Sequence, residues 1–278
     1  MKNNKFCSLI LLSLVAFVLC SCQKQTDSSS LQIENIKCEY LHNPLGIDMV
    51  SPQLSWQIKN KEVRGEKQTA YRIIVASSRD KLHNGNPDLW DSGKVETDQS
   101  QHVGYKGKSL NSRMQCYWKV MVWDKDGNPS AWSAPAFWTM GLLNKEDWTA
   151  QWIGSPDSLT APYYRKSFEL DKIPEQAFIY LASLGYYELY INGEKVGNEV
   201  LGPAVSNFSE RTYYQTYDVA GYLKKGRNSI GIWMGTGWYS PGLPGVKHHS
   251  PVVRAQLEIP GEDQHRIITD SSWETKPS

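Results

Sequence analysis

Apolar and polar residues alternate over short stretches along most of the chain, and turn-forming residues separate these stretches. In the first half the clearest examples are YRIIVASS (71–78), LWDSGKV (89–95) and CYWKVMVWDKDGNPSAWS (116–133). In the second half, strand-like runs begin near Ala161 and continue to RIITDSSWET (266–275), which we expect to be a last partial strand. Period-two alternation bounded by Gly, Asn, Asp and Pro predicts β-strands, and helical periodicity is hard to find after Ser30. The pattern predicts an all-β protein.

The stretch LGYYELYINGEKVGNEVLGP (184–203) shows this pattern most fully. Successive residues of a strand point to opposite faces, so Tyr187 and Leu189 share the face that we expect in the core. The other face carries the remaining residues of YYELY, namely Tyr186, Glu188 and Tyr190. Asn192-Gly193 then supplies two residues that tolerate the positive φ of a type I′ turn. The stretch predicts a β-hairpin.

The spacing of the strands indicates two antiparallel β-sandwiches in tandem. We expect the first over residues 31–141, with Trp118 in its core and a hairpin turn at Asp126-Gly127. Residues 142–160 form a predicted linker whose tryptophans, Trp148 and Trp152, we expect to pack against a neighbouring domain. The second sandwich is predicted over residues 161–278 and is expected to be incomplete at its C-terminus; long sandwiches of this kind are commonly jelly rolls.

Composition and charge narrow the functional classes. Lys and Arg number 30 and Asp and Glu 29, so the chain has no basic stripe and we expect no nucleic-acid partner. The 11 Trp and 15 Tyr far outnumber the 6 Phe, and both residue types suit cores as well as half-wet surfaces. We therefore expect most of these aromatics in the two cores and the rest on a sugar-stacking surface.

The first 22 residues have the pattern of a lipoprotein signal peptide. Lys2 and Lys5 precede an apolar run over residues 9–19, which is shorter than the ~20 residues of a membrane span but fits a secretory signal. The following LCSC resembles a bacterial lipobox with Cys22 at the lipidated position; an ordinary signal peptide with incidental cysteines is the alternative. Residues 23–30 are polar and predict a flexible tether. The chain is thus expected to be an exported bacterial lipoprotein, membrane-anchored in the periplasm or at the cell surface.

Two cysteines remain outside the signal peptide, Cys38 and Cys116. An exported protein can oxidise such a pair, but their sequence separation says nothing about geometry. We expect a buried free thiol at each position. Neither has metal-ligand spacing to a His or to another Cys.

The strand-like stretches occur in an order that resembles the N-terminal region of bacterial α-L-rhamnosidases, inverting glycoside hydrolases that release terminal L-rhamnose. They are AQWIG, YYRKSFEL, LGYYELYINGEKVG, YQTYDV, GTGWYSP, AQLEI and TDSSWE. YWKVMVWDKDGNPSAWSAPAFWTMG (117–141) resembles the leading fibronectin-III-like domain of that family. The resemblance implies a fibronectin-III/immunoglobulin-like sandwich followed by a jelly-roll, carbohydrate-binding-like sandwich.

Two positions depart from the family pattern. The family usually has an Asp before Pro203 and a Gly-Trp after it, where this chain has Gly202 and then Ala204-Val205. It often has an acidic residue or Asn where this chain has Thr236. If relatives contact sugar or metal at these positions, this chain has lost the contact.

The resemblance also implies a helical (α/α)6 barrel, which in the family follows these domains and carries the general acid and general base. No run with helical periodicity long enough to start such a barrel is found before Ser278. Inverting hydrolysis needs two carboxyl groups roughly 6.5–9.5 Å apart, and the sequence pairs none of the isolated candidates Glu188, Glu194, Glu199 and Glu210. We therefore predict no catalytic residue and leave open whether the chain is an enzyme. If the second sandwich is incomplete near Ser278, Trp273 is expected to lack a packing partner.

No metal ligand or cofactor is predicted. His248-His249 would point to opposite faces of a strand, which makes a poor chelate, and Gly235-Thr236-Gly237 lacks the Lys and spacing of a phosphate-binding loop. Some relatives bind rhamnose in the second domain with a calcium ion, so calcium is implied only by the resemblance. The sequence shows no acidic cage for it.

Four residues are candidates for carbohydrate binding. Sugar sites combine one or two aromatic platforms with a few polar side chains. Trp238 and Tyr239 lie in GTGWYSPGLPG, which is mostly loop by composition, while Tyr186 and Asn192 lie in the 184–203 hairpin. A Trp in such a loop stays exposed more easily than one in the middle of a strand.

Our leading hypothesis is the non-catalytic N-terminal portion of an α-L-rhamnosidase, acting either as a scaffold that also binds rhamnose-containing glycans weakly or as a scaffold alone. Its expected partners are rhamnose-containing glycans, the membrane through the lipid, and a catalytic domain in the full-length protein. One alternative is a stand-alone glycan-binding surface lipoprotein. Another is a hydrolase with an unrecognised site between the two sandwiches.

Overall fold

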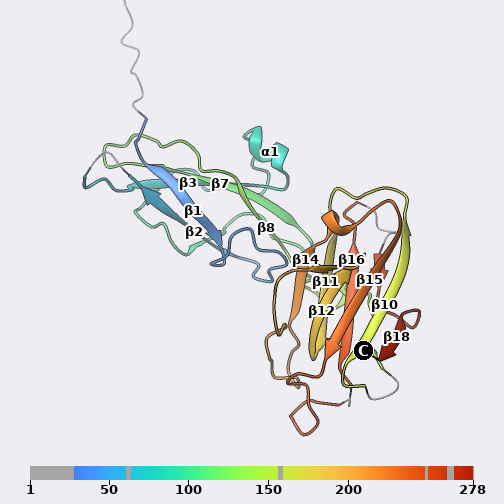
Figure 1. Cartoon of the computed structure of the whole chain (residues 1–278). Coiled ribbons are helices and arrows are strands. Elements are labelled where there is room, and N and C mark those ends of the chain that lie inside the picture. Colours follow the sequence, from blue (N-terminus) through green and yellow to red (C-terminus); the bar gives the residue numbers. More distant parts are fainter. Residues whose placement is uncertain (1–27, 61–63, 156–158, 248–249, 262–265, 278) are drawn as a thin grey trace, which may run out of the picture.

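The computed structural model describes residues 28–60, 64–155, 159–247, 250–261 and 266–277. The predicted signal peptide with Cys22, most of the tether and His248-His249 lie outside the described residues. The chain forms two β-sandwiches in tandem, joined at one end of each (Figure 1), so the predicted all-β class is confirmed. Within the described part, no helix is long and apolar enough to span a membrane.

The first sandwich packs a three-stranded sheet against a five-stranded one. The small sheet has the order β1–β2–β6, with bounds Gln32–Cys38, Gln53–Lys59 and Val103–Gly104. The larger sheet has the order β4–β3–β7–β8, and β5 also pairs with β3; the bounds in chain order are Ala70–Ala76 (β3), Trp90–Asp91 (β4), Val95–Glu96 (β5), Gln115–Trp123 (β7) and Ala136–Thr139 (β8). The short helix α1 (Arg79–His83) follows β3 and lies against the outer face of this sheet.

Alternation along β7 explains this first core. Cys116, Trp118, Val120 and Val122 are fully buried, which confirms the prediction for Trp118. The predicted turn after β7 is also present, because the Asp124 carboxylate accepts backbone N–H bonds of 3.0 and 2.8 Å from Asp126 and Asn128. Cys38 and Cys116 are buried free thiols, as predicted. Burial raises the pKa of both thiols, that of Cys116 to about 12, so neither is a thiolate near neutral pH.

The second sandwich packs two five-stranded sheets. One has the order β13–β12–β15–β10–β18, with bounds in chain order Pro162–Leu170 (β10), Tyr186–Ile191 (β12), Glu194–Val196 (β13), Gly226–Gly235 (β15) and Glu274–Pro277 (β18). The other has the order β14–β11–β16–β17, and β9 also pairs with β16; its bounds are Ile153–Gly154 (β9), Phe178–Leu184 (β11), Tyr214–Asp218 (β14), Val252–Glu258 (β16) and Arg266–Ile268 (β17). Two 3₁₀ turns, η1 (Lys145–Asp147) and η2 (Ala220–Tyr222), complete the elements.

The predicted hairpin is formed by β12 and β13. Tyr187 and Leu189 are buried between the sheets, as the alternation predicts, while Tyr186 is only half-buried on the outer face. Asn192 and Gly193 form the turn with φ of 54° and 89°, which is the left-handed geometry that an Asn-Gly pair accommodates.

The last stretch of the chain differs from the prediction. Residues 266–275 do not form one partial strand, because β17 pairs with β16 in one sheet and β18 pairs with β10 in the other. Trp273 lies between these strands, is only 8% exposed and belongs to the core between the sheets. Its indole N–H donates a 2.8 Å hydrogen bond to the carbonyl of Ile268. The expectation that Trp273 lacks a packing partner is therefore wrong.

The predicted linker is attached to the second sandwich. Within it, β9 pairs with Val252 and Val253 of β16. The Arg254 guanidinium lies 4.9 Å from the centre of the Trp148 ring and donates hydrogen bonds to the carbonyls of Ala150 and Trp148. Trp148 thus packs as expected, whereas Trp152 is 42% exposed. These contacts fix the linker to the second sandwich, so it is not a flexible tether.

Candidate functional site

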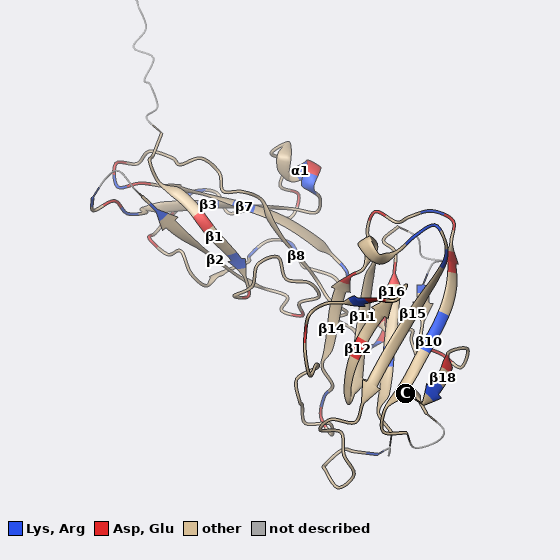
Figure 2. Cartoon of the chain, viewed as in Figure 1, with Lys and Arg blue, Asp and Glu red and all other residues tan. Residues whose placement is uncertain are grey.

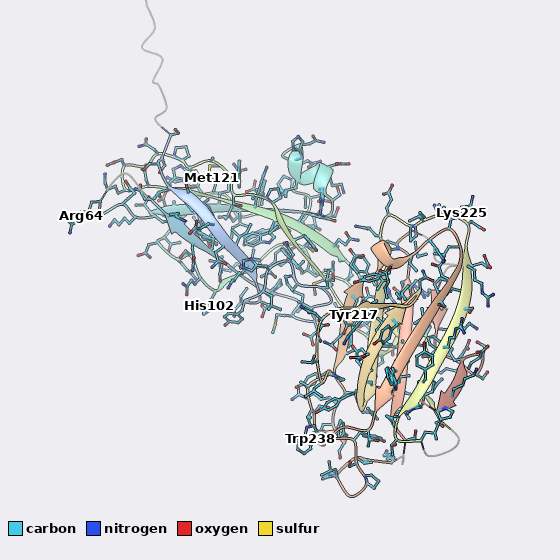
Figure 3. The ribbon with its side chains drawn as sticks, viewed as in Figure 1. Arg64, His102, Met121, Tyr217, Lys225 and Trp238 are labelled. Atoms are coloured by element: carbon cyan, nitrogen blue, oxygen red, sulfur yellow. The ribbon has the colours of Figure 1, made fainter. Side chains whose placement is uncertain are left out.

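An aromatic groove lies at the end of the second sandwich that points away from the first domain, where Trp238 is found (Figures 1 and 3). Three segments meet there: the corner between β11 and β12, the loop before β14, and the loop after β15. The residues that line the groove are Ser183, Gly185, Tyr186, Pro203, Ala204, Val205, Ser206, Phe208, Tyr213, Trp238 and Tyr239. The groove is shallow and mostly apolar.

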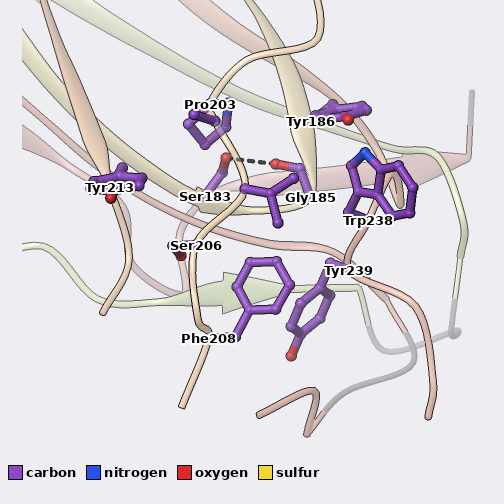
Figure 4. A pocket seen from close by; sticks show the side chains of 11 residues that line it. Ser183, Gly185, Tyr186, Pro203, Ser206, Phe208, Tyr213, Trp238 and Tyr239 are labelled. Carbon is purple, nitrogen blue, oxygen red and sulfur yellow. Dashed lines mark hydrogen bonds between the residues drawn. The ribbon is translucent and has the colours of Figure 1, made fainter. Parts of the chain in front are cut away.

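The loop after β15 presents one aromatic ring to solvent and buries the next. The backbone N–H of Tyr239 donates to the Thr236 carbonyl at 2.9 Å, which closes a tight turn. A Cβ atom on Gly237, whose φ is +51°, would lie 2.6 Å from a ring carbon of Tyr186, so only glycine lets the loop approach that ring. As a result Trp238 is 61% exposed and stands beside Tyr186 (Figure 4).

Tyr239 forms the floor of the groove. It is 1% exposed and meets Phe208 edge to face, with ring centres 5.3 Å apart and planes at 84° (Figure 4). Its hydroxyl accepts a 3.3 Å hydrogen bond from the backbone N–H of Lys247. These contacts fix the loop that carries Trp238, so Tyr239 supports the exposed ring instead of presenting its own.

The opposite wall is the segment that departs from the family pattern. Pro203, Ala204 and Val205 line the groove there, and Tyr213, 43% exposed, continues the wall. The hydroxyl of Ser206 is engaged locally, since it donates to the Arg211 carbonyl at 2.7 Å. The wall therefore offers Ala204 and Val205 where the family pattern would place a Gly-Trp pair.

The hydroxyls available to a ligand are those of tyrosines. The Ser183 hydroxyl donates to the Gly185 carbonyl at 2.8 Å and is occupied (Figure 4). Across the part of the chain that the structure describes, no hydrogen bond engages the hydroxyl of Tyr186 or Tyr213. Figure 2 shows few charged residues over the loops at this end. The groove suits a neutral ligand with an apolar face and hydroxyl groups.

The structure brings together three of the four predicted sugar-binding residues: Tyr186, Trp238 and Tyr239. Asn192 lies at the other end of β12, where its amide donates to the Tyr222 carbonyl and to Asn228 Oδ1 at 2.8 and 2.9 Å. Its own oxygen accepts from the backbone N–H of Ser229 at 3.0 Å. Asn192 holds the hairpin turn and lies outside the groove, so the structure does not bring it together with the other three residues.

Sequence reasoning missed Ser206, Phe208 and Tyr213, and it treated positions 203–205 only as a departure from the family pattern. These residues lie in a long irregular segment with no alternation, so no periodic signal indicates which of them face the groove. The position of β14 beside β11, together with a 3.1 Å hydrogen bond from the backbone N–H of Tyr187 to the Gly202 carbonyl, brings the segment under the Trp238 loop.

A second cluster of polar groups lies between the two sandwiches. Arg113 donates hydrogen bonds to Glu258 at 2.5 and 2.9 Å and to the Asp147 carboxylate at 2.7 Å. Arg266 lies 3.3 Å from the Glu258 carboxylate. Burial raises the pKa of Asp147, but hydrogen bonds from Ser112, the Asn144 backbone and Arg113 outweigh burial and lower the pKa to about 2.

This cluster is a poor candidate for glycoside hydrolysis. A general acid must hold a proton near neutral pH, and the low pKa of Asp147 keeps that carboxylate ionised. Both carboxylates are bound to the same guanidinium, which spans the interface between the domains. Among the described residues no group of three or more His, Cys, Asp or Glu side chains is arranged to hold a metal ion.

Fold and groove together define a class: an immunoglobulin-like sandwich followed by a second β-sandwich that carries an aromatic groove at its far end. Residues 33–144 match the model of the Rha78A-like, N-terminal immunoglobulin domain. Residues 172–278 match the model of the alpha-L-rhamnosidase N-terminal domain. The chain therefore carries the two N-terminal domains of the α-L-rhamnosidase family and belongs with the N-terminal region of these proteins.

Known relatives agree with this assignment. An alpha-L-rhamnosidase of Formosa agariphila is 36% identical over 98% of this chain and 32% of its own length. The solved alpha-L-rhamnosidase of Dictyoglumus thermophilum superposes with a TM-score of 0.81 at 35% identity, over 91% of this chain and 30% of its own. The solved alpha-L-rhamnosidase of Aspergillus terreus superposes with a TM-score of 0.76 at 27% identity, over 89% of this chain and 29% of its own. The chain spans about a third of the length of the relatives that it matches.

Proposed function

We propose that the chain is the non-catalytic N-terminal region of an α-L-rhamnosidase and that the Trp238 groove contacts rhamnose-containing glycans. The observation that carries the proposal is the 61% exposure of Trp238 beside Tyr186, on a loop fixed by the buried Tyr239. Large exposed aromatic rings held on a rigid support are typical of ligand-binding surfaces. Hydrolysis of the rhamnoside bond is assigned to a separate catalytic domain.

The chemistry of the groove fits a deoxy sugar. One face of a pyranose presents C–H groups that stack on an indole ring, and the methyl group of rhamnose adds further apolar surface. The apolar wall of Pro203, Ala204 and Val205 lies opposite the ring. The tyrosine hydroxyls at the rim then meet the sugar hydroxyls and provide orientation.

Replacing Trp238 with Ala is expected to weaken L-rhamnose binding about 10- to 150-fold, because stacking on an indole ring is worth ~1.5–3 kcal/mol. The binding is measured by tryptophan fluorescence, with turnover of an aryl α-L-rhamnoside assayed in the same samples. We expect saturable binding without turnover. Calcium should leave the affinity unchanged, because the described residues form no acidic metal site.

Trp152→Ala is the matched control, since Trp152 is also exposed, at 42%, and lies outside the groove. It should bind rhamnose as the parent chain does. Equal loss of binding in both variants would place the sugar elsewhere, and absence of binding in the parent chain would leave only a scaffold. Turnover of the aryl rhamnoside would contradict the non-catalytic assignment.

The proposal includes membrane anchoring through a lipid on Cys22, supported by the apolar run over residues 9–19 and the LCSC that follows. On expression in a bacterium that processes lipoproteins, Cys22→Ala is expected to move the chain from the membrane fraction to the soluble fraction. Cys20→Ala is the control and should stay with the membrane. Membrane retention of Cys22→Ala would overturn the anchor.

A further inference from the structure

A second pocket lies on the first sandwich, between α1 and the strands β7 and β8. Its floor is apolar, formed by Leu82, Tyr117 and Phe137, and its rim carries the basic side chains Arg79, His83 and Lys119. The pocket has a volume of about 380 Å³, within the ~300–1,000 Å³ range of small-molecule sites. It lies in the other domain from the Trp238 groove and is independent of it.

The local structure keeps this pocket open. The Ser78 hydroxyl accepts a 3.3 Å hydrogen bond from the backbone N–H of Lys81, which caps α1, and Leu82 anchors the helix at 2% exposure. On the other side, the Asn43 side chain accepts a 2.9 Å hydrogen bond from the backbone N–H of Phe137. Both rims are thus held by defined contacts.

The two permanently charged rim residues rest on aromatic rings instead of carboxylates. The Arg79 guanidinium lies 5.6 Å from the centre of the Tyr117 ring, and Lys119 Nζ lies 5.1 Å from that of Trp132. Among the described residues neither forms an ion pair, and no Asp or Glu lines the pocket.

The same helix shows the contrast. Lys81, which does not line the pocket, pairs with Asp88 at 2.6 Å. Ion pairs with carboxylates also hold several other basic residues of this domain, namely Lys59, Arg72, Lys94 and Lys125. Positive charge that faces an apolar pocket attracts an anion. Because no neighbouring carboxylate neutralises the charge here, the attraction is not weakened.

We propose that this pocket binds an anionic sugar residue, with its carboxylate or sulfate group between Arg79 and Lys119 and its ring against Phe137 and Tyr117. The charge of the rim selects the anion, and the guanidinium of Arg79 offers a planar fork for it. The apolar floor and the volume select a ligand larger than an inorganic ion. A chain with both sites would engage a glycan that carries neutral and acidic residues.

The experiment titrates the purified chain with sodium D-glucuronate, glucose 6-sulfate and glucose, by calorimetry at low ionic strength. We expect the two anionic sugars to bind and glucose to bind at least tenfold more weakly. Arg79→Gln and Lys119→Gln should each weaken binding of the anionic sugars about tenfold, the typical loss of one charge-assisted hydrogen bond. Lys81→Gln, with the same charge change on the same helix, should leave it unchanged.

Several outcomes would overturn the proposal. They are no binding of either anionic sugar, equal binding of acetate or inorganic sulfate, and equal weakening by Lys81→Gln. Binding of poly-glutamate without binding of the sugars would also overturn it and would assign the pocket to an acidic protein segment. Glucuronate binding without glucose 6-sulfate binding supports a uronate, and the reverse supports a sulfated sugar. Thermal unfolding of each variant confirms that the fold is retained.

Discussion

Replacing Trp273 with Ala is expected to lower the free energy of unfolding of the second sandwich by about 3–5 kcal/mol. Trp273 is 8% exposed and fills the core between β17 and β18, which belong to different sheets. The substitution removes the indole ring that packs between the two sheets at this end of the core. It also leaves the Ile268 carbonyl without the 2.8 Å hydrogen bond from the indole N–H. Differential scanning calorimetry, which separates the transitions of the two domains, provides the measurement.

Trp233→Ala is the matched control for this prediction. Trp233 is a tryptophan of the same sandwich on the outer face of β15, and it is 47% exposed. Its removal should cost less than about 1 kcal/mol, as is usual for surface substitutions. If Trp273→Ala unfolds at the same temperature as Trp233→Ala, the last residues do not close the core as described.

Replacing Arg113 with Met is expected to destabilise the junction between the domains by about 2–3 kcal/mol. The change leaves Asp147 and Glu258, whose side chains are only 17% and 9% exposed, without their shared counter-charge. Removing one partner of a fully buried ion pair costs about 3–5 kcal/mol, and the 27% exposure of Arg113 reduces that figure. Chemical unfolding at pH 7 gives the value.

The same substitution should change the pH dependence of stability. The folded pKa of Asp147, about 2, lies below the ~3.9 of an unfolded Asp, so its stabilisation is complete above about pH 4. It is lost as the pH falls from 4 towards 2. In Arg113→Met the stability lost over this pH range should be smaller, because Arg113 no longer contributes to the lowered pKa of Asp147.

Arg72→Met is the control, because Arg72 pairs with Asp91 on the surface, with side chains 41% and 34% exposed. Exposed pairs contribute up to about 1 kcal/mol, so this variant should stay close to the parent chain. Equal effects of the two substitutions at pH 7 would contradict a structural role for the Arg113 junction.

Local alternation predicts most of the fold and fails where partners are distant in sequence. Within β12 the two-residue period places Tyr187 and Leu189 in the core, because each residue's face follows from its neighbour's. The Arg113–Glu258 pair joins residues 145 positions apart, and nothing in either local sequence indicates the other. The pocket beneath α1 cannot be predicted from local sequence either, because α1 and the strands β7 and β8 meet only in the folded domain.

The candidate groove shows a second limit. Composition predicts that the GTGWYSPGLPG loop is irregular, but it does not say which of two adjacent aromatic residues is exposed. Tyr239 is buried because Phe208 lies opposite it, and Trp238 is exposed because no described ring covers it. Asn192 fits both a turn and a sugar contact by residue type, and the turn uses its amide completely.

The position of β10 has a consequence for biosynthesis. This strand is the first of its sheet along the chain, yet its neighbours are β15 and β18, so Tyr163 pairs with Trp233 and with Lys276. On the ribosome the first sandwich can fold while the second is still being made. One edge of β10 stays unpaired until β15 has emerged and the other until β18 has emerged, and such edges invite aggregation. Non-local pairing of this kind slows folding, so the second sandwich sets the pace of maturation.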